Sequence, residues 1–201
     1  MVDSLTWMRQ WTRTQDDKDF STPYKPFPEW PYFDFLHKLF VKESRLFVEK
    51  SRTMMATWWG AAECFHYVMT RQPASCIFWC PDEDRAIKCI SYCKVLYGQQ
   101  DERLKRLYPL KKPLNQQAVY SFQFAEGGVL DALPGKNPDK IRSEHPTIVF
   151  MDEACFNEQG AEAYDNAVST RPAKLIAVSS AAPSWFEELT KCAVPIALDA
   201  A

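Results

Sequence analysis

Two adjacent carboxylates, Asp152 and Glu153, directly follow the apolar and β-branched stretch TIVFM at 147–151. A continuous run of this kind predicts a strand buried on both faces, as in a parallel sheet. The two acids would then lie at the carboxyl end of the strand, where open α/β sheets bind their ligands. There the first acid can hold Mg²⁺ and the second can orient or deprotonate an attacking water. The pair predicts a metal–nucleotide site, with simple capping of the following helix as the alternative.

A second candidate site is the segment 51–57, which follows a strand expected at 45–50 and leads into a helix expected to run through Met69. A strand, loop and helix in this order are the context of a phosphate-binding loop, GxxxxGK[ST]. Met55 and Ala56 stand where that loop has its second glycine and its lysine. Thr57 is retained for Mg²⁺, and Arg52 offers a guanidinium that can neutralise phosphate charge. The candidate nucleotide contacts are Ser51, Arg52, Thr53, Met54, Met55, Ala56 and Thr57.

Strands and helices alternate along the rest of the chain, which predicts a doubly wound, mostly parallel sheet. Further strands are expected at 74–80 and 174–179, and helices at 33–41, 81–97, 156–170 and 184–192. The sequence AEGG at 125–128 separates two apolar segments and predicts a β-hairpin.

The length, charge and cysteine content of the chain limit the kinds of protein that it could be. The 201 residues suffice for one large α/β domain, and 46% hydrophobic and 25% charged residues are ordinary for a globular protein. A net charge of -2 gives no global nucleic-acid signature, so DNA contact would need a local patch. One basic cluster could form such a patch, and it comprises Lys105, Arg106, Lys111 and Lys112. The alternative is that these residues only form a solvated surface. Seven cysteines without CxxC spacing favour reduced thiols, and no 18-residue apolar run predicts a membrane span.

Four motifs together resemble the ATPase domain of large terminase subunits, the DNA-packaging motors of tailed bacteriophages. EKSRTMMATWW resembles the family's deviant phosphate loop (Walker A), in which an arginine precedes the variable segment. TIVFMDEA resembles its Walker B strand, and FAEGGVLDALP resembles the hairpin before that strand. LIAVSSAAP at 175–183 resembles its coupling motif. The motifs occur in the family's order and cover roughly residues 40 to 185.

The resemblance implies an α/β, P-loop NTPase fold of the ASCE or RecA-like type, with three layers and a mostly parallel sheet flanked by helices. It implies Mg²⁺-dependent ATP hydrolysis that translocates viral double-stranded DNA into the procapsid. The implied partners are double-stranded DNA, the portal protein and the small terminase subunit, at the portal vertex in the host cytoplasm. The motor would be a homo-oligomeric ring, with a monomer in isolation as the alternative. We expect an N-terminal arm at 1–32 and the ATPase domain at 33–201, without the family's C-terminal nuclease domain.

The resemblance also assigns roles to residues in the two candidate sites. Arg52 and Thr57 would contact the phosphates and Mg²⁺. Asp152 would organise the Mg²⁺, and Glu153 would be the catalytic base or the group that positions water.

Three further residues take roles from the resemblance alone. Ser179 and Ser180 would sense the γ-phosphate and pass its state to the following segment. Arg142 lies where terminases place an arginine that acts on a neighbouring subunit, with an ordinary surface arginine as the alternative.

Two other functions compete with this interpretation. A helicase-like or other P-loop ATPase would share the acidic strand end but would carry further helicase motifs and a second RecA-like domain. A degenerate nucleotide-binding or assembly module would account for the missing lysine. The retained Glu153 weighs against that module, because a site that only binds needs no base.

Overall fold

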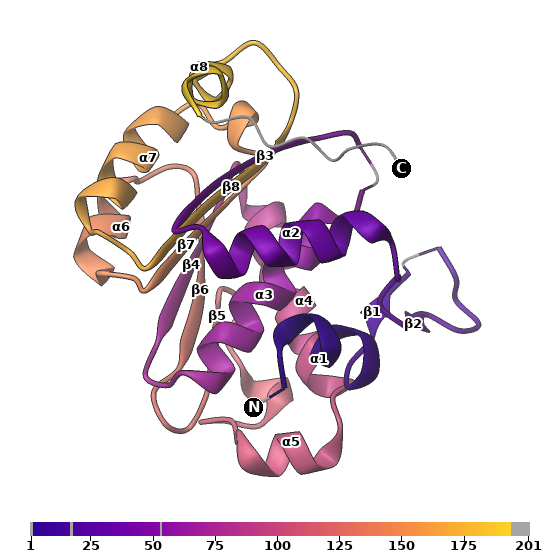
Figure 1. The fold of residues 1–201 in the computed structure, drawn as a ribbon. Helices are drawn as coiled ribbons and strands as arrows, with labels where there is room; N and C mark the ends of the chain where they lie inside the picture. Colours follow the sequence, from indigo (N-terminus) through magenta and orange to yellow (C-terminus); the bar gives the residue numbers. More distant parts are fainter. Residues whose placement is uncertain (1, 17, 53, 194–201) are drawn as a thin grey trace.

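The computed structural model describes residues 2–16, 18–52 and 54–193, so the predicted contact Thr53 lies outside the described residues. A six-stranded sheet forms its centre, in the order β3-β8-β7-β4-β6-β5 (Figure 1). The bounds are β3 Arg45–Lys50, β4 Ser75–Cys80, β5 Ser121–Gln123, β6 Val129–Pro134, β7 Ile148–Asp152 and β8 Lys174–Ser180. The first five strands in the sheet order are parallel, and β5 pairs antiparallel with β6. The predicted α/β fold with a mostly parallel sheet and the predicted hairpin are confirmed.

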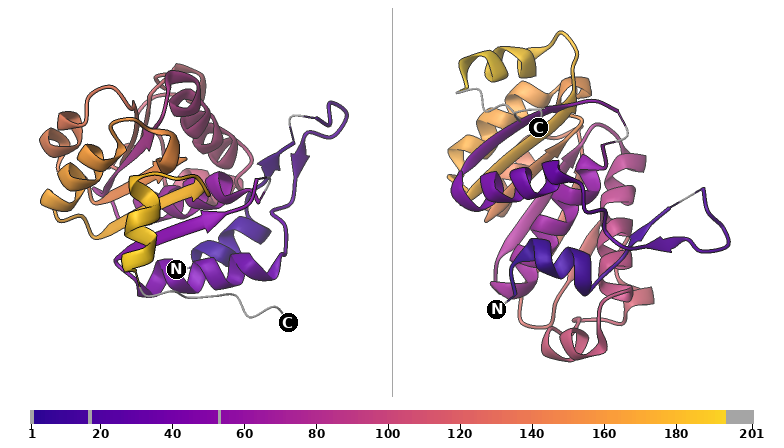
Figure 2. Two further views of the ribbon diagram at one scale, coloured as in Figure 1. Left: turned by 90° about the horizontal axis from the view of Figure 1, so that it is seen from above. Right: turned by 45° about the vertical axis from the view of Figure 1, so that its right-hand side comes forward.

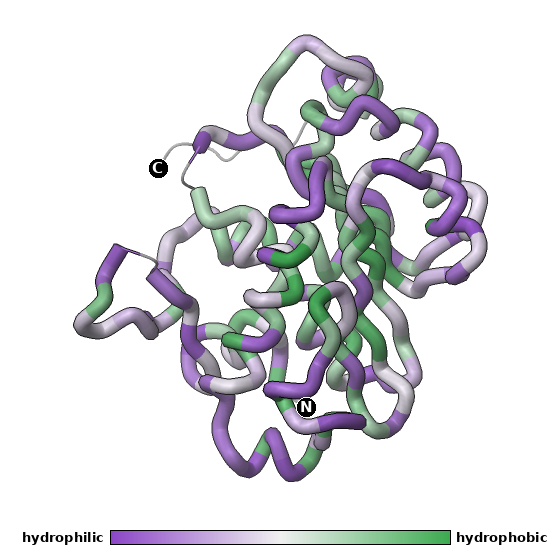
Figure 3. The backbone as a smooth tube through the Cα atoms, turned by 180° about the vertical axis from the view of Figure 1, so that it is seen from behind, coloured by the Kyte–Doolittle hydropathy of each residue, from purple (hydrophilic) through white to green (hydrophobic). Residues whose placement is uncertain are grey.

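Helices cover both faces of the sheet (Figure 2). One face carries α1 Ser4–Gln10, α2 Pro31–Lys42, α3 Ala56–Thr70 and α4 Glu83–Gly98, and the other carries α6 Asp139–Glu144, α7 Gly160–Ser169 and α8 Trp185–Cys192. Neighbouring residues of β7 point to opposite sides: Phe150 packs into the first layer, and Val149 and Met151 pack into the second. The hydrophobic stretches therefore gather along the central strands (Figure 3), as expected for strands buried on both faces.

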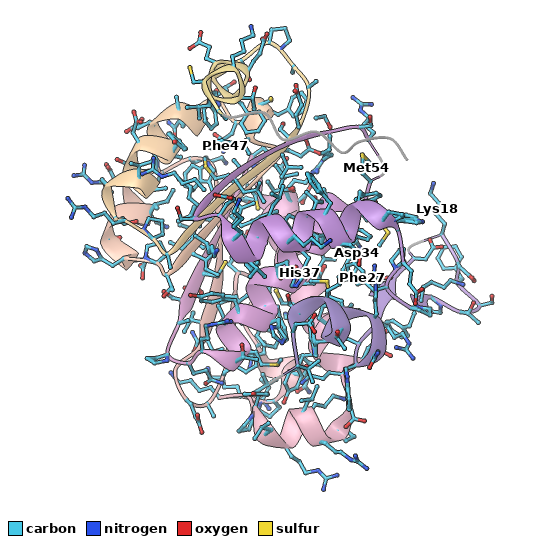
Figure 4. All side chains as sticks on the ribbon, in the orientation of Figure 1. Lys18, Phe27, Asp34, His37, Phe47 and Met54 are labelled. Carbon is cyan, nitrogen blue, oxygen red and sulfur yellow. The ribbon has the colours of Figure 1, made fainter. Side chains whose placement is uncertain are left out.

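The start of the chain joins the same core. Trp7 of α1 is buried, stacks on Phe65 with ring centroids 5.6 Å apart, and donates its indole N–H to Gln100 Oε1 at 3.0 Å. Glu63 of α3 is fully buried and accepts hydrogen bonds from Ser4 of α1 and from His37 of α2, which Figure 4 labels. The division into an arm at 1–32 and a domain at 33–201 stays a prediction, but α1 packs as part of the helical layer.

Short elements complete the described chain. They are β1 Thr14–Gln15, β2 Tyr24–Lys25, α5 Glu102–Leu107 and the 3-10 turns η1 Leu114–Gln116 and η2 Ala154–Phe156. The hairpin of β1 and β2 projects from the body of the molecule (Figure 1). No helix within the described ranges is long and apolar enough to cross a membrane. All seven cysteines are free thiols.

The predicted start of the helix at 156 is wrong, because α7 begins at Gly160. Glu153 adopts a positive φ of 46°, and the 3-10 turn η2 follows it. The side chain of Asn157 then accepts a hydrogen bond from the backbone N–H of Gln159 at 3.0 Å. Asparagine side chains compete with helical hydrogen bonding in this way, so the helix starts only after this turn.

Helix α3 approaches the sheet most closely at Gly60, where an added Cβ would overlap the ring of Phe150. We expect Gly60→Ala to lower the free energy of unfolding by about 1–3 kcal/mol, because the ring and the helix would have to separate. Urea denaturation measures this change. Gly98→Ala at the end of α4 is the matched control, since its Cβ would meet only Leu114 at 3.4 Å. Equal stability of the two variants would contradict the close approach.

His66 on α3 is buried, and this burial lowers its pKa to about 4 from the usual 6.5. The unfolded chain therefore binds more protons between these two pH values, and stability is lost as pH falls through this window. His66→Gln removes this titration. From pH 7 to pH 4, its free energy of unfolding should rise relative to the parent by up to about 3 kcal/mol. Urea denaturation measures the free energies of unfolding of the parent and of His66→Gln. A difference between them that does not change with pH would contradict the lowered pKa of His66.

Candidate functional site

The carboxyl ends of three neighbouring strands bring the predicted site together. Lys50 ends β3, Ser180 ends β8 and Asp152 ends β7. In the parallel register Lys50 lies opposite Ser180, and Asp152 lies opposite Val178 on the next strand. Because parallel strands end at the same edge, side chains far apart in the sequence form one cluster there.

Asp152 and Thr57 form the inner part of this cluster. Thr57, in the first turn of α3, donates its hydroxyl to Asp152 Oδ1 at 2.7 Å. Asp152 is only 2% exposed, and burial raises its pKa to about 6, although the Thr57 hydrogen bond acts in the opposite direction. A hydroxyl and a carboxylate fit Mg²⁺, which uses few protein oxygens and completes its shell with water and phosphate. Within 2–16, 18–52 and 54–193, no group of three or more His, Cys, Asp or Glu could hold a metal.

Glu153 forms the outer part, together with Lys50 and Ser180. Lys50 Nζ donates to Glu153 Oε1 at 2.8 Å and to Ser180 Oγ at 3.1 Å. The backbone N–H of Ser180 donates to Glu153 Oε2 at 3.2 Å. Burial acts to raise the pKa of Glu153, but the hydrogen bonds from Lys50 and the Ser180 N–H outweigh it, so the pKa lies below its usual value. Glu153 is therefore an ionised carboxylate. The ammonium group of Lys50 binds one of its oxygens, and the backbone amide of Ser180 binds the other.

Sequence reasoning missed Lys50. The phosphate-loop motif directs attention to the position of Ala56, which is buried at the start of α3 and brings no charge. A lysine is nevertheless present in the cluster, seven positions before Thr57, as the last residue of β3. Its position directly before the loop was the available signal. Lys50 therefore places a second cation, besides Arg52, on the same cavity.

In the described part of the loop, one backbone conformation and one hydrogen bond stand out. Met55, in the place of the second glycine, adopts a positive φ of 49°, a conformation that normally favours glycine. Tyr32 donates its hydroxyl to the carbonyl of Met54 at 2.6 Å and so ties the loop to α2 (Figure 4 labels Met54). Burial raises the pKa of Tyr32 to about 12. Ser51 is exposed at the start of the loop.

Two cavities open on the cluster. A cavity of about 460 Å³ is lined by Lys50, Arg52, Arg85, Glu153, Phe156 and Ser180. A second, of about 250 Å³, is lined by Thr57, Arg85, Lys88, Cys89, Tyr92 and Asp152. Arg85 from α4 and Phe156 from η2 are among the further side chains that sequence reasoning missed, because only the fold brings them to this edge.

The two remaining predicted residues, Ser179 and Arg142, lie outside this cluster of side chains. Ser179 is fully buried, and its Oγ accepts the backbone N–H of Cys155 at 3.1 Å, so it stabilises the turn after Glu153. Arg142 is exposed in the last turn of α6, and the chain then enters β7 at the end opposite the carboxylates. The structure therefore brings Ser180 into the cluster but does not bring Arg142 there within one chain.

No protein-family model matches the sequence, and no curated protein matches it. Solved structures do match. The ATPase domain of the Thermus phage P74-26 large terminase aligns with 87% of this chain and 73% of that domain, at 17% identity and a TM-score of 0.53. An arginine-to-alanine mutant of the same domain aligns with 93% of this chain and 78% of its own, at 17% identity and a TM-score of 0.59.

The large terminase of bacteriophage HK97 gives a TM-score of 0.63 at 10% identity, over 89% of this chain. This chain spans 37% of the length of that protein. At such identities the likeness establishes the fold. The chain therefore has the P-loop fold of the ATPase domains of phage large terminases, as the four motifs predicted.

Proposed function

We propose that this chain is the ATPase domain of a large terminase, which hydrolyses ATP with Mg²⁺ to move double-stranded DNA into a procapsid. The observation that carries the proposal is the cluster of Lys50, Thr57, Asp152, Glu153 and Ser180 at the carboxyl edge of a P-loop fold. This cluster combines a cation, two hydroxyls and two carboxylates in distinct environments. Phosphoryl transfer to water needs groups of these kinds.

Phosphate binding falls to the loop and to the cations around the larger cavity. Lys50 and Arg52 line that cavity and would neutralise the phosphate oxygens. The first backbone amides of α3, beginning at Ala56, favour an anion at the helix N-terminus. Ser51, Thr53, Met54 and Met55 would supply the remaining loop contacts.

Thr57 and Asp152 would hold Mg²⁺. When bound, the metal neutralises charge on the β- and γ-phosphates. The elevated pKa of Asp152 supports this role, since a buried carboxylate with few hydrogen-bond donors gains from a cation.

Glu153 would position and deprotonate the attacking water, because its lowered pKa keeps it ionised. In the step, the water oxygen bonds to the γ-phosphorus, and the bond to the bridging oxygen breaks with its electron pair staying on ADP. The proton of the water passes to Glu153. In the structure, Lys50 Nζ donates a hydrogen bond to one oxygen of Glu153. Phosphates that attract Lys50 would free that oxygen for water. Ser180 contacts both side chains and could report this exchange along β8, with Ser179 fixing the adjacent turn.

The assembled motor is also part of the proposal. The exposed Arg142 would act on the active site of a neighbouring subunit in a homo-oligomeric ring. Portal protein, small terminase subunit and double-stranded DNA would be its partners in the host cytoplasm.

In the basic cluster, Lys105 already contacts Glu102 at 2.7 Å and the carbonyl of Gly98 at 2.8 Å. DNA contact there would rest on Arg106, Lys111 and Lys112.

The Lys50–Glu153 pair also favours a second candidate function, nucleotide binding with little turnover. If bound phosphates left Lys50 on Glu153, the base would stay occupied. Phosphate release by the parent chain separates the candidates: turnover that Glu153→Gln abolishes supports the ATPase, and binding without turnover supports the second candidate.

Glu153→Gln should reduce ATP hydrolysis by about 10²–10⁴-fold, because the variant lacks the base while its shape is kept. Affinity for Mg·ATP should stay within a few-fold of the parent. Phosphate release and a titration with a fluorescent ATP analogue measure the two quantities. A variant that hydrolyses like the parent would show that Glu153 is not the base.

Lys50→Met should weaken Mg·ATP binding by about 10–100-fold, the effect of losing one or two hydrogen bonds from a charged group. Arg52→Ala should weaken it less, because Arg52 is exposed. Lys140→Met on α6 removes an equal charge away from the cavities and serves as the control. Unchanged binding by Lys50→Met would contradict the assigned phosphate site.

A further inference from the structure

Arg85 reaches the site from an element that the four motifs do not include. It lies in the first turn of α4, which follows β4 directly, and its backbone N–H donates to the capping side chain of Asp82 at 2.8 Å. Strand β4 is the neighbour of β7 in the sheet. The start of α4 therefore lies beside the carboxyl end of the strand that carries Asp152.

The guanidinium of Arg85 is shared loosely between the two carboxylates. Its Nη1 is 3.8 Å from Asp152 Oδ2 and 3.8 Å from Glu153 Oε1, and the side chain is 47% exposed. Both distances exceed that of a good hydrogen bond. A structural ion pair in the same molecule differs: Arg9 holds Asp34 with both nitrogens, at 3.1 and 2.7 Å. Arg85 thus keeps donors available for a further anion.

Arg85 is also the side chain common to both cavities. On one side lie Thr57 and Asp152, the proposed metal ligands, and on the other lie Lys50 and Glu153. A terminal phosphate bound between these pairs would lie within reach of the guanidinium. Arginine matches phosphate oxygens with two parallel N–H donors, which makes it suited to this position.

We propose that Arg85 is a γ-phosphate ligand supplied by the same chain, which contacts the terminal phosphate of bound ATP opposite Lys50. The assignment rests on the proposed ATPase function and deepens it. Arg85 forms no covalent bond; it stabilises the charge on the transferred phosphoryl group. An arginine from a neighbouring subunit would add to this contact. The competing role, neutralising the adjacent acids Asp152 and Glu153, requires no nucleotide and would not distinguish ATP from ADP.

The test compares a non-hydrolysable ATP analogue, AMP-PNP, with ADP, both with Mg²⁺, by isothermal titration calorimetry on the full chain. Arg85→Ala should weaken AMP-PNP binding about 10-fold or more and leave ADP binding within about 2-fold, since ADP lacks the contacted phosphate. Arg103→Ala on α5, an exposed arginine, is the matched control and should change neither affinity. Circular dichroism checks that the variants fold.

Arg85→Lys keeps a cation beside the carboxylates and serves if Arg85→Ala does not fold. It should show a smaller loss, still selective for AMP-PNP, because lysine lacks the paired donors. Equal weakening of both nucleotides, or no weakening, would overturn the assignment of Arg85 while the proposed function stands. A parent chain that binds neither nucleotide would overturn the proposed function and this assignment with it.

Discussion

The ion pair between Lys50 and Glu153 is the constraint on which the site depends. With side chains 9% and 12% exposed and 2.8 Å between Nζ and Oε1, each charge offsets part of the cost of burying the other. The pair forms only if β3 and β7 end at the same edge, with β8 between them in register. The topology of the sheet and the chemistry of the site are thus linked through one contact between residues 103 positions apart.

In the proposed function, the same contact links bound phosphate to Glu153. Lys50 is the cation nearest to Glu153, so a triphosphate that attracts it changes the surroundings of the carboxylate directly. Glu153 and Met55 both have positive φ values, at the two loops that border the cavity. Non-glycine residues in this conformation cost free energy and are held by their surroundings. Here the surroundings are the hydrogen bonds of Ser180 to Glu153 and of Tyr32 to the loop.

Much of the fold followed from local sequence patterns. The strands β4, β7 and β8 contain apolar runs, and β3, RLFVEK, has the predicted bounds. The acidic pair at the end of β7 indicated the candidate site in the same way, because that prediction depends on the pattern of a single strand. Arg85 could not be found in this way, because it comes near the carboxylates only where α4 and β7 meet in space. For Lys50, the sequence offered only its position directly before the loop. The packing of α1 on α3 through Trp7 likewise depends on tertiary contacts and not on local pattern.

We infer that bound phosphate draws Lys50 away from Glu153. A crystal structure of the chain with Mg²⁺ and AMP-PNP tests it most directly. In that structure, Lys50 Nζ should lie within hydrogen-bond distance of a phosphate oxygen and should no longer contact Glu153. The freed oxygen of Glu153 should face a water near the γ-phosphate. A nucleotide bound in these cavities with the Lys50–Glu153 contact intact, or a nucleotide bound elsewhere on the chain, would contradict the account.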